Sequence, residues 1–261
     1  MFEEMINTIQ LGDSYELIKK IPDHSIDLVY IDIPYLYEKG GNVADDKSAV
    51  SKRIAKVRND YLKNISSGID FSILDELCRA MKYIYIYIWC SKEQILNLTK
   101  YFVEGKGCRV NYLVWCKTNP TPACDGTFLP DLEYCLVFKG KGSPRYNDGY
   151  ELKSKWFVSS LNVKDKEKYL HPTIKPLELV KRHILHSTQP NDIVLDCFAG
   201  SGTTCVAAKE TGRRYIGIEI DKEYWRIAND RLNGINANGQ MSIFTDFEQV
   251  SKEGGLLDDN N

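Results

Sequence analysis

The chain has 261 residues, of which 43% are hydrophobic and 27% are charged, a composition typical of a globular protein with one large core or two small ones. No apolar run approaches the roughly 20 residues that span a membrane, which favours a soluble cytoplasmic protein. The eight cysteines form no Cys-x-x-Cys pair and no zinc-like cluster with histidine, so we expect reduced structural thiols and no metal site.

The net charge of −2 conceals an uneven distribution along the chain. Residues 47–63 carry six bases and one acid, and residues 136–170 carry eight bases and four acids, whereas residues 241–261 carry five acids and one lysine. Each basic segment alone is typical of a solvated surface. Two of them flanking a candidate active site favour a nucleic-acid partner.

Strand and helix patterns alternate along the chain. An apolar run over 28–31 indicates a buried strand, and further strands are predicted at 81–90, 111–117, 132–139, 192–198 and 213–220. Helices are predicted at 72–82, 92–102, 176–187, 201–212 and 221–234, with His183 and His186 on one helix face rather than in a ligand set. This alternation predicts a doubly wound α/β sheet, with residues 1–235 as a single domain and 236–261 as a flexible acidic tail.

A glycine-rich turn follows the predicted strand at 192–198. It leads into a helix, and Glu219 ends the next strand. Gly200 and Gly202 let the backbone approach a ligand closely, and an acid at the position of Glu219 can hydrogen-bond ribose hydroxyls. The turn lacks the third glycine of the pyrophosphate fingerprint and the Gly-Lys-Ser/Thr of a phosphate loop. This pattern favours a cofactor with an adenosine and no phosphate near the turn, such as S-adenosylmethionine (SAM), over the dinucleotide of an oxidoreductase.

Three segments together resemble the amino-methylating DNA methyltransferases, which act on the exocyclic amine of adenine or cytosine. They are Asp32-Ile33-Pro34-Tyr35, His171-Pro172-Thr173-Ile174-Lys175-Pro176 and Asp196-Cys197-Phe198-Ala199-Gly200-Ser201-Gly202-Thr203-Thr204. The catalytic tetrapeptide precedes the cofactor loop, which is the motif order of the family's β class, and the resemblance spans roughly residues 7–233. It implies a Rossmann-like SAM-dependent methyltransferase fold with a mostly parallel seven-stranded sheet and helices on both faces.

The resemblance also implies roles for individual residues. Asp32 and the main-chain carbonyl of Ile33 would accept hydrogen bonds from the two N–H groups of the target amine, and Tyr35, after Pro34, would stack on a base turned out of the duplex. Lys175 would pair with the carboxylate of the cofactor. The full set of expected cofactor residues is Asp13, Thr173, Lys175, Asp196, Phe198, Ala199, Gly200, Ser201, Gly202, Thr203 and Glu219.

Ile33 departs from the family, which usually has proline there. The carbonyl is retained, and Pro34 still steers the preceding residue toward extended conformations, but the fixed φ of the first proline is lost. Three functions stay open: an adenine-N6 methyltransferase, favoured because Asp rather than Ser opens the tetrapeptide; a cytosine-N4 methyltransferase; and a catalytically weakened relative that binds SAM and DNA.

Double-stranded DNA is the expected partner, and the enzyme would be cytoplasmic, bacterial or phage-encoded. Sequence readout is expected in a short region between about 118 and 170. The segment Gln240-Met241-Ser242-Ile243-Phe244 resembles a motif that docks on the replication sliding clamp, and a tail that folds onto its own domain is the alternative. The oligomeric state stays open, a homodimer included. The expected DNA contacts are Lys52, Arg53, Lys56, Arg58, Lys117 and Asn119.

Overall fold

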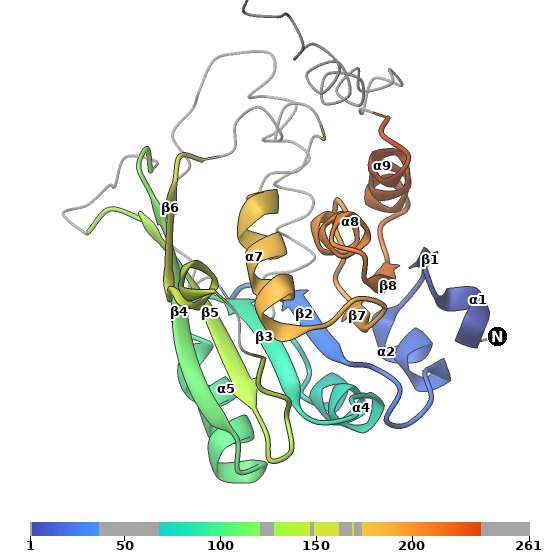
Figure 1. Cartoon of the computed structure of the whole chain (residues 1–261), viewed down its shortest axis with the longest axis horizontal. Helices are drawn as coiled ribbons and strands as arrows, with labels where there is room; N and C mark the ends of the chain where they lie inside the picture. The colour runs from blue at the N-terminus through green and yellow to red at the C-terminus, as the bar shows by residue number, and fades with distance from the viewer. Residues whose placement is uncertain are drawn as a thin grey trace, which may run out of the picture.

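The computed structural model describes residues 2–36, 68–120, 128–146, 149–161, 169 and 174–235. Helices and strands alternate along these residues, and the strands lie side by side in one sheet (Figure 1). The strands are β1 (Thr8–Leu11), β2 (Leu28–Asp32), β3 (Tyr85–Cys90), β4 (Arg109–Lys117), β5 (Leu132–Lys139), β6 (Trp156–Ser159), β7 (Ile193–Asp196) and β8 (Arg214–Glu219). The helices are α1 (Phe2–Met5), α2 (Ser14–Leu17), η1 (Ile18–Lys20), α4 (Ser72–Ala80), α5 (Ile95–Thr99), η2 (Lys100–Gly105), η3 (Tyr150–Lys153), α7 (Leu177–Ser187), α8 (Thr203–Glu210) and α9 (Lys222–Leu232).

The sheet has the order β1-β8-β7-β2-β3-β5-β4-β6. Every neighbouring pair is parallel except β3–β5 and β5–β4, so β5 alone runs against the others among the described strands. This arrangement confirms the doubly wound, mostly parallel α/β fold. The described strands number eight rather than the seven that the family resemblance implies.

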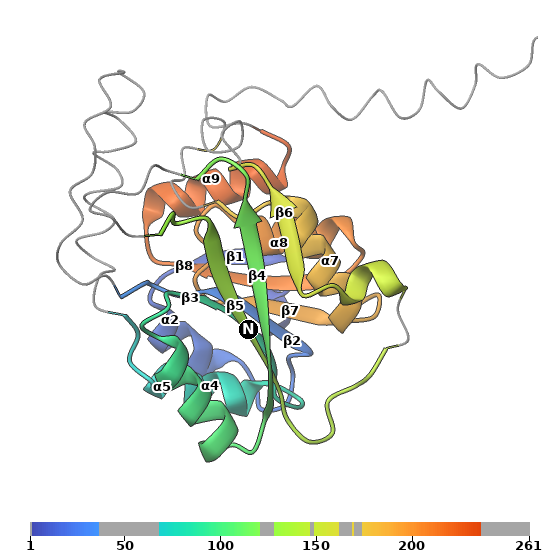
Figure 2. The same cartoon turned by 90° about the vertical axis from the view of Figure 1, so that its left-hand side faces the viewer.

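Helices cover the sheet on both faces (Figures 1 and 2). Alternate residues of β2 enter the two cores: Val29 and Ile31 pack with residues of η1, α4 and α5, whereas Leu28 and Tyr30 pack with residues of α7, α8 and α9. Because both faces are covered, the central strands are buried throughout and read as continuous apolar runs in the sequence.

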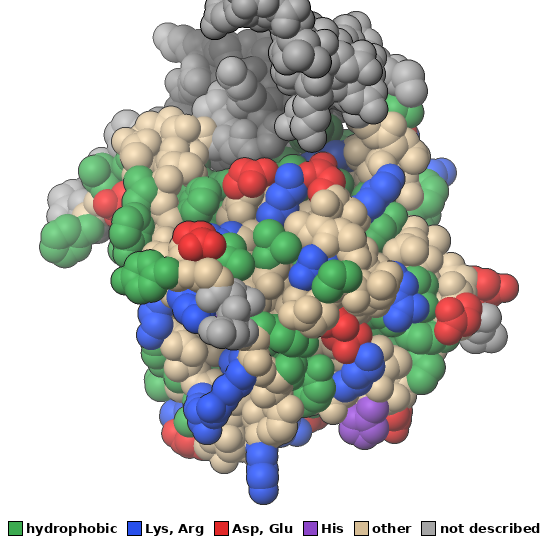
Figure 3. All heavy atoms as spheres, viewed as in Figure 1, with side chains coloured by type: hydrophobic (Ala, Val, Ile, Leu, Met, Phe, Trp, Pro, Cys, Tyr) green, Lys and Arg blue, Asp and Glu red, His purple; other side chains and the backbone are tan. Residues whose placement is uncertain are grey.

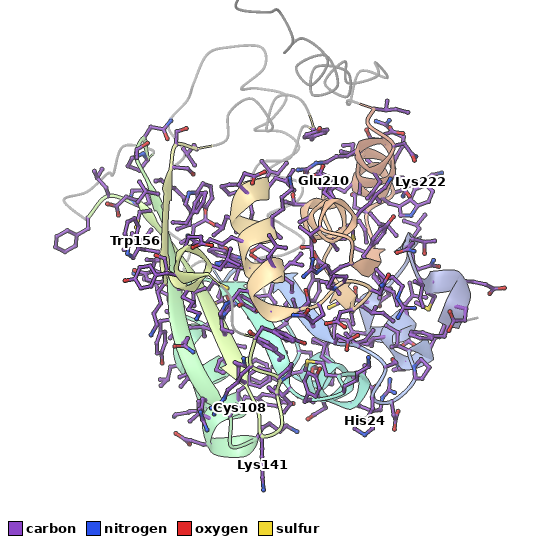
Figure 4. All side chains as sticks on the ribbon, viewed as in Figure 1. His24, Cys108, Lys141, Trp156, Glu210 and Lys222 are labelled. Atoms are coloured by element: carbon purple, nitrogen blue, oxygen red, sulfur yellow. The ribbon has the colours of Figure 1, made fainter. Side chains whose placement is uncertain are left out.

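Several described elements differ from the sequence predictions, among them the short helices α1, α2, η1 and η3, which were not predicted. The predicted helix at 92–102 is divided into α5 and η2, a π-helix over Lys100–Gly105. The short strands β1 and β6 were not predicted. β6 lies at the sheet edge, where Trp156 is 60% exposed (Figure 4). It falls, with β5 and η3, within the expected recognition region at 118–170, so the described part of that region belongs largely to the sheet and its edge.

The carboxyl ends of the parallel strands lie next to one another along one end of the sheet. We call this end, which runs across the strands from β1 to β6, the carboxyl edge. His24, which precedes β2, and Lys141, which follows the antiparallel β5, mark the opposite edge at the bottom of Figure 4. Asp32, Asp196 and Glu219 end β2, β7 and β8 and therefore lie along the carboxyl edge. Antiparallel β5 begins where the others end, which brings Glu133 to this edge as well. In doubly wound sheets, ligands bind at this edge.

Candidate active site

The tetrapeptide at 32–35 continues the pairing of β2 with β3 for one residue. Ile33 N donates to Trp89 O at 3.2 Å, and the Ile33 side chain is 2% exposed within the core. Beyond this point Ser91 N donates to Gln94 Oε1 at 2.9 Å, and Gln94 Nε2 donates to Pro34 O at 2.8 Å. No described residue donates to the Ile33 carbonyl oxygen. A proline at position 33 would lack the N–H that makes the first of these bonds.

One oxygen of the Asp32 carboxylate accepts a hydrogen bond, and the other accepts none from the described residues. Lys175 Nζ donates to Oδ2, whereas Oδ1 is buried and has no hydrogen-bond partner among the described residues. Burial raises the pKa of Asp32 above its usual value, although Lys175 opposes the shift. A buried acceptor without a donor is costly in a folded protein, so the open oxygen is a candidate position for a substrate donor.

Lys175 lies at the centre of a charged cluster. Its side chain is 5% exposed, and Nζ contacts Asp32 Oδ2, Glu133 Oε2 at 3.1 Å and Tyr35 OH at 3.3 Å. Burial opposes the charged form, but Asp32 and Glu133 outweigh this effect and raise the pKa of Lys175, so the amine is a cation. Lys175 was expected to pair with the carboxylate of a cofactor; here it pairs with two carboxylates of the protein itself.

Glu133 is the residue at this site that the sequence analysis did not identify. Its Oε1 lies 2.7 Å from Lys117 Nζ, and its Oε2 accepts from Lys175 and, at 3.5 Å, from Tyr35 OH. Burial favours the neutral acid, but the two lysines hold the pKa of Glu133 below its usual value. The available signal was an acid near the start of the apolar run 132–139, which is weak because the ends of strands often carry a charge, as Lys139 does at the other end of this run.

The glycine turn between β7 and α8 is tightly built. Gly200 and Gly202 have φ of +50° and +77°, values that favour glycine. A Cβ at Gly202 would lie 2.9 Å from Ala228 Cβ, so the turn is packed against α9. Arg231 of α9 is buried and donates to Thr203 Oγ1 at 2.7 Å and to Ser201 O at 3.3 Å. The turn is therefore held from outside by a neighbouring helix.

Glu219 connects this turn to the end of β8. Its Oε2 accepts from Gly200 N at 2.7 Å and its Oε1 accepts from Asp221 N at 2.8 Å, which orients the carboxylate while leaving each oxygen a further lone pair. Burial raises the pKa of Glu219. An oriented carboxylate beside a glycine turn fits the ribose of an adenosine cofactor.

Asp196 and Asp13 flank the same turn. Asp196 Oδ1 accepts from Phe198 N at 3.0 Å, and burial raises the pKa of Asp196 to about 7, with Asp32 and Glu219 adding to the shift. The influence of Asp32 on Asp196 agrees with their positions on the adjacent strands β2 and β7. Asp13 caps α2 by accepting from Tyr15 N at 2.9 Å. Those of the predicted catalytic and cofactor residues that the structure describes thus lie along the carboxyl edge.

The expected DNA contacts divide into two groups. Lys117 lies in the charged cluster with its side chain 13% exposed, and Asn119 is exposed, with Oδ1 accepting from Leu161 N at 2.5 Å. On the face shown in Figure 3, described bases and acids are interspersed. Outside the described residues lie Lys52, Arg53, Lys56, Arg58 and Thr173, together with the clamp-like segment Gln240–Phe244.

A doubly wound sheet with a glycine turn, a distal acid and a largely buried carboxylate on the adjacent strand is the arrangement expected of a methyltransferase that uses an adenosine cofactor. The model of the DNA methylase family, which comprises N6 and N4 methylases, matches residues 26–230, and the chain belongs to this family. It is therefore a SAM-dependent DNA methyltransferase. Among the described residues, no helix is both long and apolar enough to cross a membrane.

Similar proteins agree with this assignment. The type II methyltransferase M2.LlaDCHI of Lactococcus lactis subsp. cremoris is 32% identical over 85% of this chain and 87% of its own length. M.HinfI of Haemophilus influenzae is 33% identical over 90% of this chain and 70% of its own. Of the solved structures, the M1.HpyAVI–SAM complex is 29% identical, with a TM-score of 0.64 over 87% of this chain and 98% of that chain. The cytosine-N4-specific PvuII methyltransferase, at 17% identity and a TM-score of 0.62 over 89% of this chain and 93% of that chain, shares the fold.

Proposed function

We propose that the enzyme methylates the exocyclic N6 amine of adenine, with Asp32 and the Ile33 carbonyl as the acceptors for that amine. One observation carries the proposal: Asp32 Oδ1 is a buried acceptor without a described donor, on the strand adjacent to the glycine turn. Adenine is preferred over cytosine as the proposed substrate because Asp32 is the first residue of the tetrapeptide. Cytosine-N4 is the second candidate, because both bases present an amine.

The chemistry asks for two acceptors rather than a covalent nucleophile. The lone pair of an exocyclic amine is delocalised into the ring, and acceptors at its two N–H groups draw the nitrogen toward tetrahedral geometry. SAM, when bound, supplies an electrophilic methyl group on a sulfonium. Asp32 also suits the single proton that the amine releases, because burial raises its pKa toward that of a useful base.

The observations on the turn support SAM binding by this chain's own residues. Gly200 and Gly202 would allow close approach, and Glu219 would take the ribose hydroxyls. The remaining residues assigned to SAM are Asp13, Thr173, Asp196, Phe198, Ala199, Ser201 and Thr203. Lys175 stays the proposed partner of the methionine carboxylate, which would join Asp32 and Glu133 around the same ammonium group.

DNA would enter over the carboxyl edge. Tyr35 would stack on the flipped base, with its hydroxyl held by Lys175 and Glu133. Asn119 and the basic residues at 52–58 would contact the duplex, and residues 118–170 would read its sequence. Lys117 serves this proposal better as a partner of Glu133 than as a phosphate contact. We keep a cytoplasmic location, a homodimer and clamp docking through Gln240–Phe244 as lesser parts of the proposal.

The hydrogen bonds around Ile33 argue against the weakened relative. Proline restricts φ, whereas here the bond from Ile33 N to Trp89 O holds the peptide that precedes Ile33. The bond from Gln94 Nε2 to Pro34 O holds the peptide that follows Pro34, so the Ile33 carbonyl lies between two anchored peptides.

Mass analysis of nucleosides separates the candidates. Unmethylated DNA of varied sequence is treated with enzyme and SAM, and N6-methyladenine is the expected product. N4-methylcytosine would select the second candidate. SAM binding by calorimetry with neither product formed at high enzyme concentration would select the weakened relative.

A further inference from the structure

Glu133 links strands β4 and β5 to the segment before α7 through its ion pairs with Lys117 and Lys175. It comes from the antiparallel strand β5, whereas Asp32 comes from β2 and Lys175 precedes α7. With Lys117 of β4, these side chains form a largely buried set of two carboxylates and two amines. The set is electrically neutral when all four groups are charged, which offsets part of the cost of burying it.

Lys175 divides its hydrogen bonds between the two carboxylates and Tyr35. A buried ammonium needs compensating charge, and Glu133 supplies part of it beside Asp32. If Glu133 lost its charge, Asp32 would be the only carboxylate left on Lys175. Lys175 would then compete with the target amine for Asp32, and Tyr35 would keep only a neutral acceptor at position 133.

We propose that Glu133 is a positioning residue for methyl transfer: through Lys175 and Tyr35 it fixes the Asp32 carboxylate with Oδ1 open and divides the lysine charge between two acids. The inference rests on the proposed function, because it assigns Glu133 a part in presenting the acceptor to the base. Glu133 touches neither the base nor SAM in this account; it acts on the groups that do.

The groups around Asp32 predict a specific pH effect. Those facing it are Lys175, Glu133, Tyr35, Asp196 on β7, Tyr30 on β2 and the thiols of Cys90 on β3 and Cys135 on β5. Burial raises the pKa of Cys90 to about 12, so this thiol stays neutral in the working range. The negative charge of Glu133 adds to the raised pKa of Asp32, and its removal lowers that pKa. The acid limb of the rate profile therefore moves to lower pH when Glu133 becomes neutral.

Glu133→Gln tests the proposal because glutamine keeps the size and the acceptor oxygen but not the charge. We expect kcat in the methyl-transfer assay to fall about 10- to 100-fold, the scale of a misplaced catalytic group, with the KM for SAM changed by less than about threefold. The acid limb of kcat should move down by about one pH unit, the size that one nearby charge produces. Glu133→Asp, which restores the charge on a shorter side chain, should return the acid limb to its wild-type position.

Asp27→Asn is the matched control. Asp27 is another buried carboxylate paired with a lysine, Lys82 at 2.7 Å, but it lies at the amino end of β2. This variant should lose thermal stability and keep the wild-type pH profile. A wild-type kcat and pH profile in Glu133→Gln would overturn the inference, and so would a lower kcat with an unmoved acid limb.

The variant Asp32→Ala distinguishes this failure from failure of the proposed function. If Asp32→Ala loses methyl transfer while Glu133→Gln behaves as wild type, only the role of Glu133 is wrong. If Asp32→Ala retains the wild-type rate, the acceptor assignment itself is wrong, and the inference about Glu133 is lost with it.

Discussion

Ile33 is the residue at which this chain departs from its family, and its environment explains how the departure is accommodated. Proline at this position would fix φ through its ring, whereas isoleucine fixes the peptide through its N–H, which donates to Trp89 O at 3.2 Å. Its side chain fills the core beneath the site. The side chain therefore serves stability, and the carbonyl is available for chemistry.

Replacing Ile33 with alanine should separate these two contributions. The lost packing should lower the free energy of unfolding by about 2–5 kcal/mol, measured by urea denaturation. Because the carbonyl and the N–H remain, kcat should stay within about threefold of wild type at a temperature where the variant is folded. A 100-fold loss of kcat in a folded variant would contradict the assignment of the main-chain carbonyl.

Asp196 links pH to stability at the glycine turn. Its pKa is raised to about 7 in the folded protein, mainly by burial, against about 3.9 in an unfolded chain. The folded state then binds the proton more tightly, so this group's stabilising contribution is full below about pH 4 and is lost as the pH rises through about 7.

Asp196→Asn should remove that contribution while keeping an oxygen for Phe198 N. The stability of the variant relative to wild type should therefore increase between pH 5 and pH 8, by about 1–3 kcal/mol in urea denaturation. A difference between the two proteins that is constant over this range would show that Asp196 does not titrate in it.

At the scale of elements, the sheet joins its parts through buried polar contacts that pattern analysis does not reveal. The Tyr/Ile alternation of 81–90 predicts a strand, and both faces of β3 prove to be buried. Tyr85 and Tyr87 reach Ser187 of α7 at 2.7 Å each, and Trp89 Nε1 donates to Tyr30 OH at 2.9 Å. The tyrosines are thus buried with their hydroxyls satisfied, which a period-2 pattern cannot distinguish from exposure.

The contact between the glycine turn and α9 gives a prediction at this scale. Gly202→Ala would combine a left-handed φ with a Cβ only 2.9 Å from Ala228 Cβ, and should displace the turn from α9. We expect the Kd for SAM, measured by calorimetry, to rise at least about tenfold, equivalent to about 1.4 kcal/mol.

Gly212→Ala is its matched control. Gly212 has a φ of +74°, but among the described residues no heavy atom lies within 4 Å of the place that a Cβ would take, so only backbone strain of about 1–2 kcal/mol applies. This variant should lose stability and bind SAM as wild type does. Equal SAM affinities in the two glycine variants would mean that packing against α9 does not shape the site.

At the scale of the whole molecule, the sequence was sufficient for the fold class and for bringing three distant motifs to one edge, because parallel strands share their carboxyl ends. It was insufficient for β1 and β6, which are four residues long and carry little periodicity. Glu133 was not predicted as a site residue, because its position depends on the antiparallel direction of β5. Lys117 and Lys175 were expected to contact DNA and the cofactor, whereas in the structure both pair with Glu133. Pairings across the sheet are long-range, and no local pattern encodes them.

Charge distribution gives a prediction for DNA binding. If Lys52, Arg53, Lys56 and Arg58 contact phosphates, replacing all four with glutamine should reduce the magnitude of the slope of log affinity against log salt by about 3–4. Fluorescence anisotropy with a duplex over a salt series measures the slope. Lys141→Gln, on the opposite edge in Figure 4, should leave it unchanged. An unchanged slope in the fourfold variant would remove these residues from the interface.

The most direct test of the account is single-turnover methyl transfer by Asp32→Ala with labelled SAM and DNA, alongside SAM binding by calorimetry. We predict a loss of at least about 100-fold in the transfer rate, the scale of removing one preorganised polar partner of the transition state, with SAM still bound. A rate within about tenfold of wild type would contradict the assignment of Asp32 as the acceptor for the target amine.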